Sequence, residues 1–314
     1  MIVEKLYRVK RYAIKAYHKY FTIENPHTYI LSDKSFIKKL YKKRMGREIN
    51  LSNPQTFTEK QNWLKLYDRK PIYTVMVDKY LAREFVKERI GEEYLVPLLG
   101  VWNNADEIDF SELPDKFVLK CNHNSDVIIF KDGIFTSKNN SILTQEEAIK
   151  KLNEQLKVDY YQSKREWPYK NIPRKIICEK YMENCDGTNP IEYKVFCFNG
   201  KARYVIVMSE RFSDSGISMD TYDIEWKYTN LINGDSRLMG DVFEKPKNFD
   251  DMINIAQKLS ADIPFLRVDF NCWNEQTYFG ELTFFDAAGF EHYQPEEWDS
   301  KLGELITLPK KRGR

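Results

Sequence analysis

The first 21 residues contain no uncharged apolar run, and the chain contains no closely spaced pair of cysteines. A membrane span needs about 20 apolar residues, so we expect neither a span nor a secretion signal at the start. The five cysteines are scattered and odd in number, without a C-x-x-C pair. This spacing argues against a disulfide framework or a zinc site, and it predicts reduced, mostly buried thiols in a cytoplasmic protein.

The chain also lacks a marked excess of charge. Its 49 Lys and Arg residues against 47 Asp and Glu residues give a net charge of +2, which points to no nucleic acid or other polyanion as a partner. A hydrophobic content of 42% with 31% charged residues is typical of a soluble globular protein. The length of 314 residues allows a large core, arranged as one large domain or as two to three lobes.

Residues 1–21 combine Lys and Arg with aromatic and aliphatic side chains. A basic amphipathic helix of this kind either lies on an anionic membrane surface, here the inner face of the membrane, or packs on its own domain with its charged face in solvent. Both readings stay open. Residues 310–314 are strongly basic, and we expect them to form a solvated tail.

The hydrophobic spacing changes along the chain from helical to strand-like, without internal repeats. Helical spacing covers residues 58–67, 72–90, 146–156 and 249–259, with Thr144 as the cap of the third helix. Apolar or alternating runs predict strands over residues 95–101, 116–121, 127–131, 176–178, 193–198, 202–208 and 222–226. Helices followed by mixed strands and helices indicate an α+β protein with two lobes.

Residues 265–270 and 278–285 are aromatic and β-branched, and the polar residues 271–277 separate them. This pattern predicts two strands of one β-hairpin. Because side chains alternate between faces, Arg267 and Asp269 share one face of the first strand. If the loop centres on Glu275, Asp269 lies opposite Glu281 and Arg267 lies opposite Thr283.

Two opposed carboxylates, with β-carbons roughly 5 Å apart, repel each other. A divalent cation between Asp269 and Glu281 removes the repulsion, and oxygen ligands of this kind suit Mg²⁺. Two alternatives remain: one carboxylate faces solvent, or the register differs by one residue.

Two further segments carry candidate ligand contacts. Lys120 ends an apolar strand and precedes a loop of small polar residues, an arrangement that can bind phosphate through the ammonium group and backbone N–H groups. Residues 179–182 follow the apolar residues 176–178, and an extended segment there can bind the edge of an adenine through its backbone. The alternatives are an ordinary surface lysine and an ordinary strand end.

The order of these elements resembles the ATP-grasp superfamily, through Asp78-Lys79, residues 118–120, residues 179–182, Arg267-Val268-Asp269 and residues 280–283. Longer motifs resemble its TupA-like branch. They are PQTFTEK over residues 54–60, WLKLYDR over 63–69, the stretch 91–102, REWPY over 165–169, YKVFCFNG over 193–200 and PEEW over 295–298. The resemblance covers roughly residues 35–308.

The resemblance implies an α+β ATP-grasp fold in which ATP lies between two lobes, and a chemistry in which a carboxylate is phosphorylated and then captured by an amine. It implies a helical segment over residues 1–50, a helix-rich region over 51–115, a small lobe over 116–180 and a large lobe over 181–314. By position, Lys79 and Lys120 resemble the lysines that neutralise the ATP phosphates, and Lys194 resembles the residue that reaches the γ-phosphate.

The remaining roles follow from the same resemblance. Arg267 resembles the residue that steadies an acyl phosphate, and Asp269 and Glu281 resemble the metal carboxylates. The adenine segment is Glu179, Lys180, Tyr181 and Met182, with Asp186 preferred over Glu183 for the ribose.

Two departures from the superfamily pattern concern the loop and the metal site. Ser125-Asp126-Val127 stands where glycines are expected, so His123 and Ser125 are the candidates for phosphate contacts. Thr283 stands where an asparagine commonly completes the metal site, and we expect one well-held ion and a second that depends on nucleotide. Residues 122–126 and 211–218 are the candidates for a loop that closes over the site.

TupA-like proteins are associated with bacterial cell-surface polysaccharide synthesis. The resemblance therefore suggests an amide between a uronic-acid carboxylate, on a free or lipid-linked saccharide, and an amino acid or amino alcohol. The 20 Tyr, 19 Phe and 6 Trp residues suit sugar stacking, although aromatic cores are the commoner explanation. The candidates for the sugar pocket are Arg165, Trp167, Arg211 and His292.

Two other classes of function remain as alternatives. A glycosyltransferase of the same pathway needs a nucleotide-sugar site with a D-x-D-type motif, and the sequence has none. A nucleotide-binding scaffold without turnover is compatible with the loop that lacks glycine.

Overall fold

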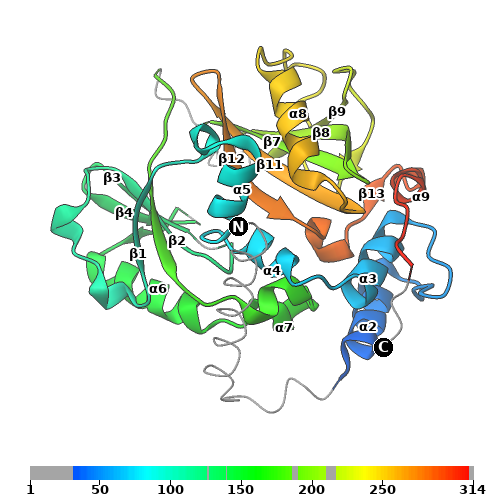
Figure 1. The fold of residues 1–314 in the computed structure, drawn as a ribbon, viewed down its shortest axis with the longest axis horizontal. Coiled ribbons are helices and arrows are strands. Elements are labelled where there is room, and N and C mark those ends of the chain that lie inside the picture. Colours follow the sequence, from blue (N-terminus) through cyan, green and yellow to red (C-terminus); the bar gives the residue numbers. More distant parts are fainter. Residues whose placement is uncertain (1–30, 126, 139, 186–189, 210–216, 311–314) are drawn as a thin grey trace. The chain divides into compact units, whose positions relative to one another are not determined.

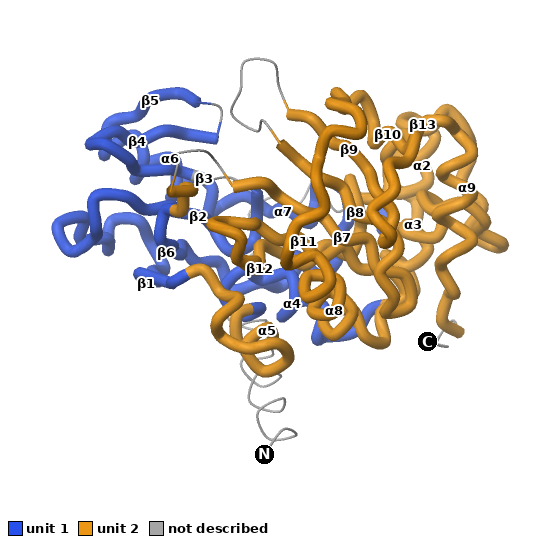
Figure 2. Tube along the Cα trace, turned by 90° about the horizontal axis from the view of Figure 1, so that it is seen from above, with its two compact units in different colours: residues 1–33, 69–82, 97–181 blue, residues 34–68, 83–96, 182–314 orange. Residues whose placement is uncertain are grey.

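A computed structural model describes residues 31–125, 127–138, 140–185, 190–209 and 217–310. The predicted basic helix over residues 1–21, Asp186 and Arg211 lie outside the described residues. By its contacts the chain divides into two compact units (Figure 2). Unit 1 takes the described residues up to 33 together with 69–82 and 97–181, and unit 2 takes residues 34–68, 83–96 and 182–314.

Among the described elements, helices α2 to α5 come first along the chain, and runs of strands interrupted by helices follow (Figure 1). The α-helices are α2 (Asp33–Met45), α3 (Phe57–Tyr67), α4 (Ile72–Val77), α5 (Ala82–Ile90), α6 (Gln145–Lys157), α7 (Tyr160–Lys164), α8 (Phe249–Ser260) and α9 (Glu297–Glu304). The strands are β1 (Leu98–Trp102), β2 (Phe117–Cys121), β3 (Val127–Lys131), β4 (Ile134–Ser137), β5 (Ile142–Leu143), β6 (Ile176–Lys180), β7 (Ile191–Phe198), β8 (Lys201–Ser209), β9 (Ser218–Asp223), β10 (Ile232–Asn233), β11 (Phe265–Trp273), β12 (Gln276–Thr283) and β13 (Tyr293–Gln294). The 3₁₀ helices are η2 (Glu92–Tyr94), η3 (Ala105–Glu107), η4 (Phe110–Glu112), η5 (Trp167–Asn171) and η6 (Asp286–Gly289).

Unit 1 is built on a six-stranded antiparallel sheet in the order β1-β6-β2-β3-β4-β5. Helix α6 packs on this sheet, and its apolar side contributes Leu152 to a core that contains Leu119 and Ile128. Thr144 caps α6 as predicted, because its hydroxyl accepts the N–H of Glu147 while the Glu147 carboxylate accepts the N–H of Thr144.

Unit 2 contains a five-stranded antiparallel sheet in the order β12-β11-β7-β8-β9, and a two-stranded pair, β10-β13. Helix α8 packs on β7, β8 and β11 (Figure 1). An aromatic cluster joins α3 to the central strands, with Phe57 in contact with Phe196 and Phe265. Within the described part of the chain, no helix has both the length and the apolarity that crossing a membrane requires.

Two predicted elements differ from the structure. The helix expected over residues 72–90 is two helices, α4 and α5, because the buried Asp78 side chain accepts the backbone N–H groups of Tyr80 and Leu81 and ends α4. The strand expected over residues 222–226 ends at Asp223. Trp226 has a φ of 63° and lies in a turn.

Helices α3 and α9 pack closely in unit 2. Thr56 and Glu59 form a capping box at the start of α3, and the Asp299 carboxylate of α9 accepts the N–H of Thr58 at 2.9 Å. Gly303 of α9 lies directly against the chain that leads into α3. A β-carbon at Gly303 would lie 2.3 Å from the Gln55 carbonyl oxygen and 2.8 Å from the Phe57 nitrogen.

We therefore expect Gly303→Ala to lower the free energy of unfolding by about 1–3 kcal/mol, because backbone rather than a flexible side chain occupies the space. Urea unfolding followed by circular dichroism measures the change. Ser300→Ala, an exposed position on the same helix, is the matched control and should stay within about 0.5 kcal/mol of the parent protein. Equal effects of the two substitutions would contradict the close packing.

Candidate active site

The hairpin of β11 and β12 has the pairing that the sequence predicts: Asp269 lies opposite Glu281 and Arg267 lies opposite Thr283. The loop is shorter than predicted, because the strands extend to Trp273 and from Gln276 and leave only two residues, both with positive φ, between them. A bulge at Gly280 shifts the register after Asp269. The bulge gives Asp269 the partner that a loop centred on Glu275 would have given.

Arg267, Asp269 and Lys194 form a compact charged cluster on one face of this sheet. The Arg267 guanidinium donates from Nε and Nη2 to the two oxygens of Asp269, each at 2.7 Å. Lys194 of β7 lies opposite Asp269 and donates from Nζ to Oδ2 at 2.8 Å. Such charge-assisted, bidentate bonds fix both partners strongly. Glu281 lies at the edge of the cluster, 3.6 Å from Arg267 Nη2, with 38% of its side chain exposed.

Asp286, which the sequence analysis did not single out, completes the surroundings of Arg267. Its Oδ1 accepts from Arg267 Nη1 at 2.6 Å and its Oδ2 accepts from the Tyr293 hydroxyl at 2.7 Å. Burial lowers the pKa of Arg267, but Asp269 and Asp286 outweigh this effect and raise that pKa well above its usual value. Burial, together with Asp286, also raises the pKa of Tyr293 far above its usual value. A lone carboxylate within the apolar run 284–290 is the signal in the sequence that points to Asp286.

In unit 1, Lys120 and Glu179 lie on the neighbouring strands β2 and β6, and Lys120 Nζ contacts Glu179 Oε2 at 2.7 Å. The side chain of Lys120 is 32% exposed, against 12% for Glu179. Lys79 lies between α4 and α5 rather than on a helix, and its Nζ donates to the Asn124 carbonyl at 2.9 Å. Both predicted phosphate lysines are therefore held beside the segment that follows β2.

That segment is held more firmly than a closing loop requires. Asn122 donates to Asp78 at 2.8 Å and to the Pro173 carbonyl at 2.9 Å, and Asn122, His123 and Asn124 are buried. These contacts do not favour Asn122, His123 and Asn124 as a closing loop, and closure over residues 122–126 or 211–218 stays a prediction. Burial lowers the pKa of His123 to about 4, so the ring is neutral at pH 7, and its Nε2 lies 3.1 Å from the Val158 carbonyl. Ser125 is exposed and accepts from Lys138.

The predicted adenine segment begins at the end of β6. The N–H of Lys180 donates to the Pro97 carbonyl at 3.0 Å, and the Tyr181 ring lies 5.3 Å from the Lys131 ammonium. Within this segment the chain passes from unit 1 to the last part of unit 2, at Met182. The Glu183 carbonyl accepts from the Trp273 indole at 2.8 Å.

The described candidates for a sugar pocket make structural contacts. Arg165 is buried, donates to the Gln162 carbonyl at 2.9 Å and forms an ion pair with Asp33 at 3.6 Å. Trp167 packs near Tyr73 in the same unit, with ring centroids 6.3 Å apart. In unit 2, a ring nitrogen of His292 lies 2.8 Å from the Arg44 carbonyl.

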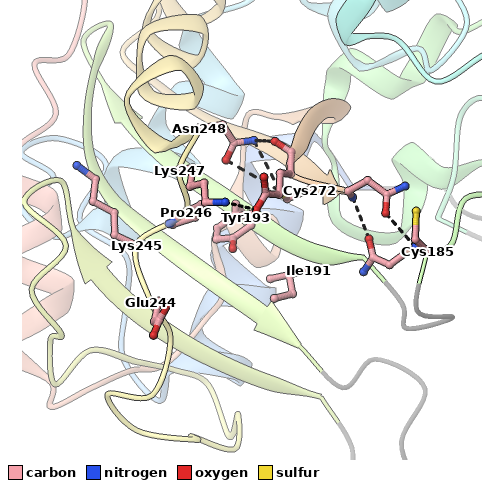
Figure 3. A pocket seen from close by; sticks show the side chains of 12 residues that line it. Cys185, Ile191, Tyr193, Glu244, Lys245, Pro246, Lys247, Asn248 and Cys272 are labelled. Carbon is pink, nitrogen blue, oxygen red and sulfur yellow. Dashed lines mark hydrogen bonds and ion pairs between the residues drawn. The ribbon is translucent and has the colours of Figure 1, made fainter.

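A cavity of about 480 Å³ opens on unit 2, next to the start of α8 (Figure 3). Ile191, Tyr193 and Cys272 line it, and these positions alternate with Lys194 and Asp269 along β7 and β11. The cavity therefore lies on the opposite face of the sheet from the charged cluster. Burial raises the pKa of the Cys272 thiol, which keeps it protonated and poorly reactive at neutral pH. Among the predicted site residues that the structure describes, none lines this cavity.

A family model described as TupA-like ATPgrasp matches residues 59–307. The chain belongs to the TupA-like ATP-grasp family. This membership confirms the α+β ATP-grasp fold expected from the sequence, with its antiparallel sheets and mixed helices. The matched range includes the hairpin, Lys194 and the lysines of unit 1. No curated protein matches the chain.

Solved structures similar to this member of the family include a D-alanine--D-alanine ligase from Bacillus anthracis complexed with ATP, at 15% identity and a TM-score of 0.40, covering 79% of this chain and 65% of the ligase. An N5-carboxyaminoimidazole ribonucleotide synthetase from Thermus thermophilus is similar at 10% identity and a TM-score of 0.38, over 67% of this chain and 45% of that chain. The ATP-grasp ligase PsnB, complexed with minimal precursor, Mg and ADP, is similar at 8% identity and a TM-score of 0.36, over 72% and 57%. This chain thus spans about two thirds or less of the length of these enzymes.

The residues around Arg267 suit a Mg²⁺ ion that is shared with a nucleotide. Asp269 and Glu281 offer hard carboxylate oxygens from paired positions, and Mg²⁺ in nucleotide sites is commonly held by one or two carboxylates plus phosphates. Within the described ranges, no three acidic, histidine or cysteine side chains are grouped closely enough to hold an ion by themselves. Asp269 is also already engaged by two cations.

We therefore expect divalent metal to bind weakly without nucleotide and at least about tenfold more tightly with ATP, because phosphate oxygens supply the missing ligands. Titration with Mn²⁺, followed by the electron paramagnetic resonance signal of the free ion, measures both affinities once the Mn²⁺ bound by ATP alone, titrated without protein, is subtracted. Asp299→Asn is the matched control, since it removes a buried carboxylate of the same unit outside the hairpin. Tight binding to the protein alone would contradict a site that depends on nucleotide.

Proposed function

We propose that this chain is an ATP-dependent ligase that joins a carboxylate to an amine through an acyl phosphate. The observation that carries the proposal is the cluster of Arg267, Lys194 and Asp269, with Glu281 opposite, in a member of the ATP-grasp family. Phosphoryl transfer needs chiefly positioning and charge neutralisation, so cations and carboxylates held in this way are a sufficient set of groups. No serine or cysteine nucleophile is required.

Each unit supplies a distinct set of groups to this reaction. In unit 1, Lys79 and Lys120 neutralise phosphates, and Ser125 is the exposed hydroxyl of the adjoining loop. His123, a predicted phosphate contact, is buried and neutral, so we assign it to the support of that loop. The adenine is bound at Glu179, Lys180, Tyr181 and Met182, with Asp186 at the ribose. In unit 2, Asp269 and Glu281, with Thr283 beside them, hold Mg²⁺, which screens the phosphate charge when bound.

The proposed reaction proceeds in two displacements. A carboxylate oxygen of the substrate forms a bond to the γ-phosphorus as the bond to the β-phosphate oxygen breaks, which releases ADP. The amine then adds to the acyl carbon, loses a proton, and the carbon–oxygen bond to phosphate breaks to give amide and inorganic phosphate. Lys194 and Arg267 stabilise the negative charge on the transferred phosphoryl group, and Arg267 stabilises the tetrahedral oxygen.

The finer proposal concerns the substrates and the setting. We infer that the carboxylate belongs to a uronic acid on a free or lipid-linked saccharide and that the amine is an amino acid or amino alcohol, used in the cytoplasm for surface polysaccharide synthesis. The family resemblance supports this choice. In the same proposal, residues 116–180 form the small lobe and residues 181–314 the large lobe of the ATP-grasp fold. Contact with the membrane through residues 1–21 belongs to the proposal as well.

Release of ADP in the presence of uronic acids and amines tests the proposed function. A uronic acid labelled with ¹⁸O in its carboxylate should transfer one ¹⁸O atom to the phosphate released, because the acyl phosphate passes through that oxygen. Omission of the amine should remove the amide from the mass spectrum. Sugar transfer from a nucleotide sugar without ATP would instead show a glycosyltransferase. Nucleotide binding without ADP release for any of the uronic acids and amines tested would indicate a nucleotide-binding scaffold without turnover.

A further inference from the structure

Arg267 is held by two carboxylates that differ in their surroundings. Asp269 lies on the sheet face beside Glu281 and is also bonded to Lys194. Asp286 lies beyond the end of β12, is 2% exposed, and has its second oxygen bonded to Tyr293. Both carboxylates are buried, at 5% and 2% exposure, but Asp269 faces the partly exposed Glu281 across the strands, and in the proposed function a metal ion binds there. When metal and nucleotide bind, the Arg267–Asp269 contact is therefore exchanged for the metal, whereas the Arg267–Asp286 contact is kept.

The loop that carries Asp286 is held in a strained conformation. Ala287 and Ala288 have φ values of 42° and 55°, a region that side chains with a β-carbon rarely adopt. Such strain persists only where the surroundings enforce it. Here Lys65 Nζ donates to the Ala288 carbonyl and Asn62 donates to the Gly289 carbonyl, each at 2.6 Å. Both donors are buried on α3, so a helix fixes the position of the Asp286 carboxylate.

We propose that Asp286 is a positioning residue that keeps the Arg267 guanidinium in place while Asp269 exchanges its contacts for a metal ion. The inference rests on the proposed function. Arg267 uses Nε and Nη2 for Asp269 and keeps Nη1 for Asp286, so the second contact survives the loss of the first. With the Asp286 charge present, Arg267 is balanced without Asp269, which lowers the cost of releasing Asp269 to the metal.

Asp286→Asn tests the proposal, because it keeps the shape of the side chain and removes its charge. Arg267 then keeps Asp269 as its only directly hydrogen-bonded carboxylate, with Glu281 3.6 Å away. We expect the Mn²⁺ concentration that half-saturates the protein in the presence of ATP to rise roughly tenfold. At saturating metal, kcat should fall roughly 10- to 100-fold, the scale seen when a residue that orients metal ligands without touching the metal is lost. KM for the amine should not change, because Asp286 is enclosed.

Asp299→Asn is the matched control. Asp299 is also a buried carboxylate of unit 2 paired with an arginine, Arg47 at 3.3 Å, but it does not touch Arg267. It should leave both the Mn²⁺ titration and kcat within about twofold of the parent protein, whatever its effect on stability. The same result for Asp286→Asn would overturn the proposal.

Two further outcomes are separable. If the parent protein binds Mn²⁺ and ATP but never releases ADP, the proposed function fails, whereas the Mn²⁺ titration still tests Asp286. If Asp286→Asn does not fold, Tyr293→Phe removes only the hydroxyl that donates to Asp286. A smaller shift of the Mn²⁺ titration in the same direction then supports the proposal, and an unchanged titration overturns it.

Discussion

Asp269→Asn should reduce ADP release by at least about 100-fold, the scale at which loss of one preorganised charged contact slows catalysis. The substitution removes the negative charge that Lys194 and Arg267 share and that we assign to the metal. ADP release with saturating ATP, amine and uronic acid measures the effect. The loss should fall on kcat rather than only on the apparent affinity for ATP, because the phosphate contacts that we propose for Lys79 and Lys120 remain.

A stability measurement is needed beside this assay, because Asp269 also balances two largely buried cations. We expect Asp269→Asn to lower the free energy of unfolding by up to about 3 kcal/mol, since a buried charge loses part of its compensation. Urea unfolding separates this loss from the catalytic effect. Asp299→Asn also removes a buried carboxylate that pairs with an arginine, so its effect on stability should be comparable, but it should retain ADP release. An unchanged rate in a folded Asp269→Asn protein would refute the mechanism.

The charged face of the hairpin could be predicted from the sequence because strand alternation is a local property. The pairing of Asp269 with Glu281 was predicted correctly, but for an incomplete reason. The prediction assumed a loop over residues 271–277, whereas the structure has a tight turn and a bulge at Gly280. A bulge depends on how two strands meet, and the sequence of one strand does not encode it. Likewise, the break at Asp78 depends on side chain to backbone bonds that hydrophobic spacing does not reveal.

The apolar run 284–290 marks Asp286 in the sequence, but its contact with Arg267 could not be predicted, for a different reason. Its contact with Arg267 requires a turn through two alanines with positive φ, and alanine is a poor signal for such a turn. The turn is imposed by α3, which lies more than 200 positions earlier in the chain. The sequence shows WLKLYDR over residues 63–69 as a family motif, but the role of its lysine becomes clear only from the long-range contact with Ala288.

Lys65→Met should therefore be among the most destabilising single changes at a charged position in this protein. Lys65 is 0% exposed, its ammonium donates to the Ala288 carbonyl at 2.6 Å, and it lies 4.2 Å from the centroid of the Phe290 ring. Methionine keeps most of the volume but leaves that buried carbonyl without this donor. We expect the free energy of unfolding to fall by about 2–4 kcal/mol, the combined scale of a lost charged hydrogen bond and a lost cation–π contact.

Lys39→Met is the control, because Lys39 is exposed on α2 and its loss should change stability by less than about 0.5 kcal/mol. Because Lys65 holds the loop that carries Asp286, its loss should also raise the half-saturating Mn²⁺ concentration, whereas Gly303→Ala should lower stability without that shift. The contrary outcome is a Lys65→Met protein that is destabilised but binds Mn²⁺ and ATP like the parent protein. In that case the contact between α3 and the Asp286 loop would not be needed to orient Arg267. The buried lysine would then serve the fold alone.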